Sequence, residues 1–183
     1  MAVEGVRERL LRAATALERA NVPYAVIGGN AVAAWVSRVD PDAVRTTKDV
    51  DILIRRADLP EIESALDAAG FELADVHGIT CFVEKSAPSP KRGIHCLFAE
   101  EPLGPHHVAP SVNETDQAPE GFRVIGLAAL VRMKLIAFLD RDRVHLRDLL
   151  ELGLIQPEHE QGLAPDLRAR LESIKSNPET QLG

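Results

Sequence analysis

Residues 45–54 read RTTKDVDILI and bring two aspartates into a short apolar run. The apolar residues between Val50 and Ile54 predict a buried strand. Side chains two positions apart on a strand share a face, so Asp49 and Asp51 are expected to point the same way. Two neighbouring carboxylates repel each other and are costly to bury, which favours a divalent cation between them. Solvated acids at an exposed strand end are the alternative.

A glycine-rich corner precedes this strand. Residues 23–27 read PYAVI and predict a short buried strand, from which Gly28-Gly29-Asn30 leads into an alanine-rich helix over residues 31–37. Glycine lets the backbone approach a ligand closely, and a helix N-terminus offers free N–H groups to an anion. The corner is therefore either a phosphate cradle or a tight turn between a strand and a helix.

The remaining chain predicts several helices and a few more strands. Apolar periodicity predicts helices over residues 3–20, 58–70, 127–139, 142–152 and 165–174, and strands over 79–84, 93–99 and 122–125. The strands at 79–84 and 93–99 are expected to form a hairpin. Residues 100–121 hold four prolines and two glycines and predict a long loop. We expect a single domain over residues 1–175, with its core at about 22–152 and a flexible tail at 176–183.

Composition narrows the class of protein. The 183 residues include 21 basic and 28 acidic side chains, and the net charge of −7 argues against an extended nucleic-acid-binding surface. No apolar run approaches the roughly 20 residues of a membrane span, and the first residues lack the pattern of a signal peptide. The sequence therefore predicts a cytoplasmic protein without a membrane partner, in which Cys81 and Cys96 are reduced thiols.

The acids and the glycine corner together suggest transfer of a nucleotidyl group, a reaction in which metal ions clamp a triphosphate. Gly28-Gly29, followed by residues 45–51 (RTTKDVD), resembles the GG…(R)-x-T-x-D-x-D signature of the polymerase-beta-like nucleotidyltransferase superfamily. The similarity is greatest to the small bacterial branch that includes the toxin-type nucleotidyltransferases of abortive-infection systems. Members of that branch carry a later helix with a lysine, here Lys134, and then an Arg/Asp-rich segment, here residues 140–148.

The resemblance implies an α+β fold, with a small mixed β-sheet flanked by helices and further helices at the C-terminal end. It implies transfer of a nucleoside monophosphate from a nucleoside triphosphate to a hydroxyl acceptor, which could be a small molecule, a tRNA end or a protein hydroxyl. Asp49 and Asp51 would be catalytic and would bind Mg²⁺. The residues implied to bind the nucleotide are Gly28, Gly29, Asn30, Thr47 and Lys134. For Lys134, an ion pair or a solvated helix face is the alternative.

One position departs from the family pattern. Active members place a third carboxylate on a neighbouring strand, and here His95 occupies that position in the strand at 93–99. A neutral histidine could accept a proton from the attacking hydroxyl, but it is a poor ligand for magnesium. Glu84, on the partner strand, is another source of a carboxylate, and a hydrogen-bonded core histidine is the other interpretation of His95. The alternative function is a catalytically degenerate protein that acts as a nucleotide-binding, regulatory or toxin–antitoxin module.

Overall fold

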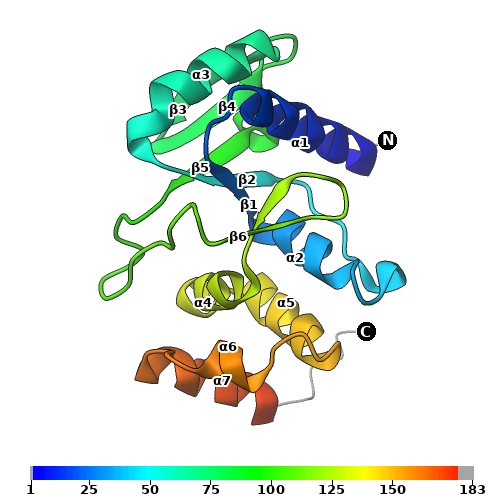
Figure 1. The fold of residues 1–183 in the computed structure, drawn as a ribbon, viewed down its shortest axis with the longest axis vertical. Helices are drawn as coiled ribbons and strands as arrows, with labels where there is room; N and C mark the ends of the chain where they lie inside the picture. The colour runs from blue at the N-terminus through cyan, green and yellow to red at the C-terminus, as the bar shows by residue number, and fades with distance from the viewer. Residues whose placement is uncertain (1, 177–183) are drawn as a thin grey trace.

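The computed structural model describes residues 2–176, and within them seven strands form one mixed sheet that is accompanied by seven α-helices (Figure 1). The sheet order is β3-β4-β5-β2-β1-β7-β6. β2 runs parallel to β5 and β1 runs parallel to β7, whereas all other neighbours are antiparallel. The strands are β1 (Tyr24–Ile27), β2 (Val50–Ile54), β3 (Phe71–Val76), β4 (Ile79–Glu84), β5 (Ile94–Phe98), β6 (Thr115–Gln117) and β7 (Arg123–Ile125). The predicted α+β class with a mixed sheet is confirmed.

The helices divide into two groups. α1 and α3 pack on each other beside the β3–β4 end of the sheet, whereas α4 to α7 gather in a separate layer that meets the sheet through α2 (Figure 1). The helices are α1 (Ala2–Arg19), α2 (Gly28–Val36), α3 (Leu59–Ala68), α4 (Leu127–Ala137), α5 (Asp140–Glu151), α6 (Pro157–Glu160) and α7 (Pro165–Ser176). The predicted tail, apart from Ser176, lies outside the described residues.

The centre of the sheet is the most apolar part of the chain. Ile52, Leu53 and Ile54 on β2 are at most 1% exposed, because neighbouring strands pair with both edges and helices cover the faces. Burial of an aliphatic side chain of this size contributes about 1.5–3 kcal/mol. None of the helices in the described part of the chain has the length and apolar character needed to cross a membrane.

Two of the strands and one of the α-helices were not predicted from the sequence. β3 is an edge strand with only its first residue buried, and β6 has three polar residues, so neither shows an apolar strand pattern. α6 has only four residues. The first helix after the glycine corner also differs from its prediction, because α2 begins at Gly28 and not at Ala31. Both glycines therefore lie in the first turn of α2.

Candidate active site

Asp51 and His95 lie side by side on the two central parallel strands. Their Cα atoms are partners in the β2–β5 register, and Oδ1 of Asp51 lies 3.5 Å from Nδ1 of His95. The other ring nitrogen, Nε2, lies 2.9 Å from the carbonyl oxygen of Pro90. The interaction with the Asp51 carboxylate raises the pKa of His95, against the opposing effect of burial. Both side chains are about one-third exposed, so His95 is not a core histidine.

Asp49 lies just before β2, and its carboxylate has different surroundings. Asp51 borders one cavity, Asp49 borders a second hollow, and His95 borders both. Within residues 2–176 no group of three or more His, Cys, Asp or Glu side chains is spaced to hold a metal ion by itself. A cation at Asp51 would therefore need a ligand, such as a phosphate, to complete its coordination shell.

The glycine corner lies directly against Asp51. Gly28 has a φ of +67°, a left-handed conformation that favours glycine, and a Cβ atom at this position would overlap Oδ2 of Asp51. A Cβ atom on Gly29 would lie 2.8 Å from Oγ1 of Thr47. Because neither glycine has a Cβ atom, the backbone of the corner can lie against the side chains of Asp51 and Thr47. The first N–H groups of α2 have no side-chain cap from Ile27.

Asn30 and Thr47 support the loop that carries the acids. The side-chain amide of Asn30 donates to the backbone carbonyl of Asp49 at 2.7 Å, and the Thr47 hydroxyl donates to the same oxygen at 3.4 Å. Both side chains line a third hollow, on which neither Asp51 nor His95 borders. The structure thus separates them from Gly28, Asp51, His95 and Lys134, which share the main cavity.

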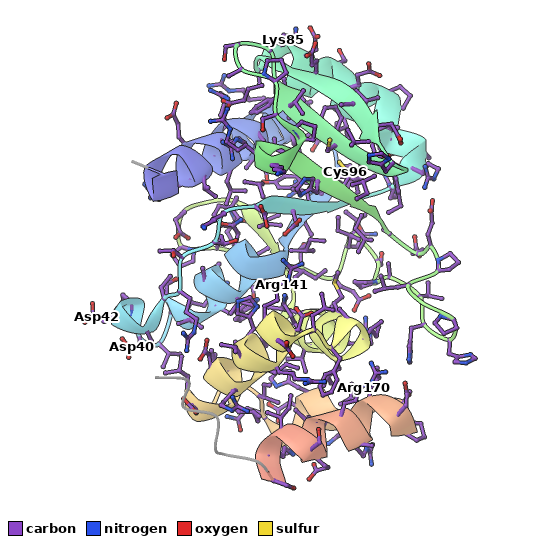
Figure 2. The ribbon with its side chains drawn as sticks, turned by 180° about the vertical axis from the view of Figure 1, so that it is seen from behind. Asp40, Asp42, Lys85, Cys96, Arg141 and Arg170 are labelled. Carbon is purple, nitrogen blue, oxygen red and sulfur yellow. The ribbon has the colours of Figure 1, made fainter. Side chains whose placement is uncertain are left out.

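The main cavity has a volume of about 300 Å³ and lies between the sheet and the helical layer. Cys96 on β5 and Arg141 on α5 both line it, and Figure 2 shows the first in the sheet and the second beside the helical layer. Arg141 is exposed, and among the described residues it has no ion-pair partner. Burial raises the pKa of the Cys96 thiol, which makes this side chain a poor nucleophile at neutral pH. Cys81 and Cys96 are both free thiols, as predicted.

The cationic wall of the cavity is anchored by a buried ion pair. Nζ of Lys134 on α4 lies 2.7 Å from Oδ1 of Asp142 on α5, and both side chains are less than 10% exposed. Of the interpretations of Lys134 given above, the structure shows the ion pair and not a solvated helix face. Nδ1 of the neighbouring His145 is buried without a hydrogen-bond partner. Burial, together with the charge of Lys134, lowers the pKa of His145 to about 4.

Two other charged residues have structural partners. Arg45 donates to both carboxylate oxygens of Asp148, at 2.6 and 3.0 Å, and so ties the loop before β2 to α5. Glu84 forms ion pairs with Arg12 and Arg9 on α1, at the end of β4 that pairs with Phe71. The interpretation of Glu84 as a substitute third carboxylate is therefore wrong, because these arginines hold it away from Asp51. Arg141 lies within the Arg/Asp-rich segment at residues 140–148, but no sequence pattern singles it out as the member that lines the cavity.

No protein-family model and no curated protein sequence matches the chain. Solved structures do. The antibiotic-resistance factor ANT(2″)-Ia in solution is 14% identical, with a TM-score of 0.52 over 98% of this chain and 86% of that one. The crystal structure of ANT(2″)-Ia with adenylyl-2″-tobramycin is 14% identical, with a TM-score of 0.58 over 94% and 98%. An antigenic nucleotidyltransferase-like protein from Paracoccidioides brasiliensis is 16% identical, with a TM-score of 0.63 over 97% and 91%. The chain has the nucleotidyltransferase fold, and at these identities the likeness shows the fold alone.

Proposed function

We propose that the protein transfers a nucleoside monophosphate from a nucleoside triphosphate to a hydroxyl acceptor. The observation that carries this proposal is the meeting of Asp51 with the glycine corner at the edge of a cavity whose opposite wall holds Arg141. An acid that can bind a cation, a backbone cradle and a free guanidinium are the three groups that a metal–triphosphate complex requires. The nucleotidyltransferase fold of the chain agrees with this chemistry.

The residues around Asp51 fit a divalent cation. The missing Cβ of Gly28 lets the carboxylate of Asp51 lie against the backbone, and Nδ1 of His95, 3.5 Å from Oδ1 of Asp51, is a second donor beside it. When bound, such an ion would neutralise phosphate charge and stabilise the attacking and leaving oxygens. Mg²⁺ remains the ion predicted from the pair of aspartates.

The chain's own residues would position the triphosphate. Gly28 and Gly29 would let the phosphates approach the N-terminus of α2, where unpaired N–H groups favour negative charge. Arg141 would bind the outer phosphates, because it is the exposed and unpaired cation of the cavity among the described residues. Lys134 is neutralised by Asp142, so we assign it a positioning role: its ion pair fixes the first turn of α5, which carries Arg141. Positioning and electrostatics would supply most of the rate gain.

The second hollow is the proposed site of the acceptor. It has a volume of about 470 Å³ and borders His95 and Asp49, so a hydroxyl bound there could approach a phosphate held at Asp51. Its remaining lining residues are Val76, His77, Ile79, Cys81, Pro90 and Lys91. One of the similar structures is that of ANT(2″)-Ia in complex with adenylyl-2″-tobramycin. A small-molecule acceptor fits this hollow, whereas a tRNA end or a protein hydroxyl would have to reach into it.

A transfer assay tests the proposal. The protein is incubated with each of the four nucleoside triphosphates labelled at the α-phosphate, a divalent cation, and either small hydroxyl compounds, tRNA or protein extract. We expect the label to appear on one class of acceptor with release of pyrophosphate, and Asp51→Asn to abolish this transfer. Label on tRNA would support the toxin-type branch. Nucleotide that binds but is never transferred would contradict the proposal and favour the nucleotide-binding module.

A further inference from the structure

The hydrogen bonding of His95 fixes which of its ring nitrogens can bind a ligand. Nε2 lies 2.9 Å from the carbonyl oxygen of Pro90, and a carbonyl can only accept a hydrogen bond, so Nε2 carries a hydrogen. In the neutral ring the lone pair is therefore on Nδ1. That atom lies 3.5 Å from Oδ1 of Asp51. The nitrogen that carries the lone pair and a carboxylate oxygen thus lie close together, and both residues line the main cavity.

Two such donor atoms repel each other unless a positive species lies between them. Ligand nitrogen and oxygen atoms lie about 2.0–2.2 Å from a transition-metal ion. If the angle between two such ligands at the metal lies between the octahedral and the tetrahedral value, the two ligand atoms are about 3.0–3.5 Å apart. The spacing of Nδ1 and Oδ1 falls at the upper end of this range. A histidine ligand also usually donates its other N–H to a backbone carbonyl, as Nε2 does to Pro90 here.

We infer that Nδ1 of His95 and Oδ1 of Asp51 are two ligands of one divalent ion, and that the site therefore prefers a first-row transition ion such as Mn²⁺ over Mg²⁺. Magnesium favours a shell of oxygen atoms, whereas an imidazole nitrogen increases the affinity for transition ions. The inference rests on the proposed function, because a phosphate supplies the ligands that the protein lacks. It also changes the predicted role of His95 from proton acceptor to metal ligand, because Nδ1 lies beside the carboxylate of Asp51.

Pulsed electron paramagnetic resonance of Mn²⁺ tests this assignment directly. The protein, labelled with ¹⁵N in histidine only, is mixed with Mn²⁺ and inorganic tripolyphosphate, which contains no nitrogen. We expect a directly coordinated ¹⁵N signal in the wild type. The signal should persist in His106→Asn, an exposed histidine outside the cavity. It should disappear in His95→Asp while Mn²⁺ stays bound, and in Asp51→Asn the bound Mn²⁺ itself should be lost.

Competition between ions provides the second measurement. We expect Mn²⁺ to bind about tenfold more tightly than Mg²⁺ in the wild type, and this ratio to fall several-fold in His95→Asp, which offers oxygen alone. Bound Mn²⁺ that depends on Asp51 but shows no histidine nitrogen would overturn the inference and indicate that a proton lies between the two side chains. Absence of any bound Mn²⁺ would overturn it as well.

The two proposals fail in different ways. Nucleotide transfer by a protein without a nitrogen signal leaves the proposed function intact and removes His95 from the metal. A nitrogen signal without transfer to any acceptor supports the ligand assignment and contradicts the proposed function.

Discussion

Lys134 on α4 and Asp142 on α5 form a buried ion pair with an Nζ–Oδ1 distance of 2.7 Å. The second oxygen of Asp142 accepts the backbone N–H of Leu139 at 3.2 Å, so one carboxylate both neutralises the lysine and caps the first turn of α5. This arrangement holds the α4–α5 corner that forms one wall of the main cavity. The pair thus links the stability of the helical layer to the position of Arg141.

Removing one partner of this pair should be costly. Asp142→Asn leaves the Lys134 ammonium buried without its counter-charge, and we expect the free energy of unfolding to fall by about 3 kcal/mol. Urea denaturation measures this change. Asp140→Asn is the control, because the Asp140 side chain is 99% exposed and its loss should cost less than about 0.5 kcal/mol. Equal effects of the two substitutions would show that the buried pair is not what holds the corner.

Gly28 should resist substitution for a reason that is specific to the site. Gly28→Ala adds a methyl group that overlaps Asp51 and also strains a left-handed backbone. Gly70→Ala is the matched control, because Gly70 has a φ of +88° but open space around its Cβ position. We expect both variants to lose about 1–2 kcal/mol of stability from backbone strain. Only Gly28→Ala should also lose cation-dependent nucleotide binding in calorimetry, and intact binding would contradict the cradle.

Arg141 should contribute to nucleotide affinity without supporting the fold. Arg141→Gln removes the exposed cavity cation, and we expect the affinity for a nucleoside triphosphate to fall about tenfold with little change in unfolding. Arg143→Gln provides the comparison, since Arg143 pairs with Asp140 and stacks on Phe138 away from the cavity. Its affinity should change less than about twofold. If Arg143→Gln weakens binding as much as Arg141→Gln does, the loss of affinity comes from the removal of positive charge from the surface in general, and Arg141 has no specific role.

His145 should make the protein sensitive to mild acid. The pKa of His145 is about 4 in the folded protein and about 6.5 in an unfolded chain, so between these values the unfolded state binds the proton more tightly. Above pH 6.5 the ring is neutral in both states. As the pH falls from 6.5 toward 4, its contribution to stability is lost. We expect a loss of about 2 kcal/mol after allowing for partial solvent screening.

His145→Gln isolates this effect from the titration of the carboxylates, which both proteins share. Urea unfolding at pH 7 and at pH 4.5 should show that the wild type loses more stability than the variant over this interval. The same loss in both proteins would mean that His145 is not the group that titrates.

The central strands and most helices could be predicted because their apolar residues recur with a clear period. The strands β1, β2 and β5 lie where they were predicted, and the pairing of Asp51 with His95 agrees with the position that the family resemblance gave to His95. The edge strands β3 and β6 could not be predicted, because a strand that is paired on one side and solvated on the other can be mostly polar.

The site was harder to predict than the fold, because its distances depend on tertiary packing. Sequence spacing placed Asp49 and Asp51 on one face, but Asp49 precedes β2 and borders a different hollow. Asn30 and Thr47 carry polar groups that suit a phosphate, yet the side chains of both donate hydrogen bonds to the backbone carbonyl of Asp49. The value of Arg141 depends on its having no ion-pair partner among residues 2–176, which no sequence pattern encodes. The single-domain boundaries and the roles of these residues stay predictions.

The decisive measurement is calorimetry of a non-hydrolysable nucleoside triphosphate with the wild type and with Asp51→Asn, each with and without a divalent cation. We predict that the wild type binds the nucleotide only with the cation and that Asp51→Asn loses this binding. Asp67→Asn, an exposed acid paired with Lys85 far from the cavity, should bind as the wild type does. An unchanged affinity in Asp51→Asn would contradict the assignment of Asp51 to the cation and, with it, the proposed function.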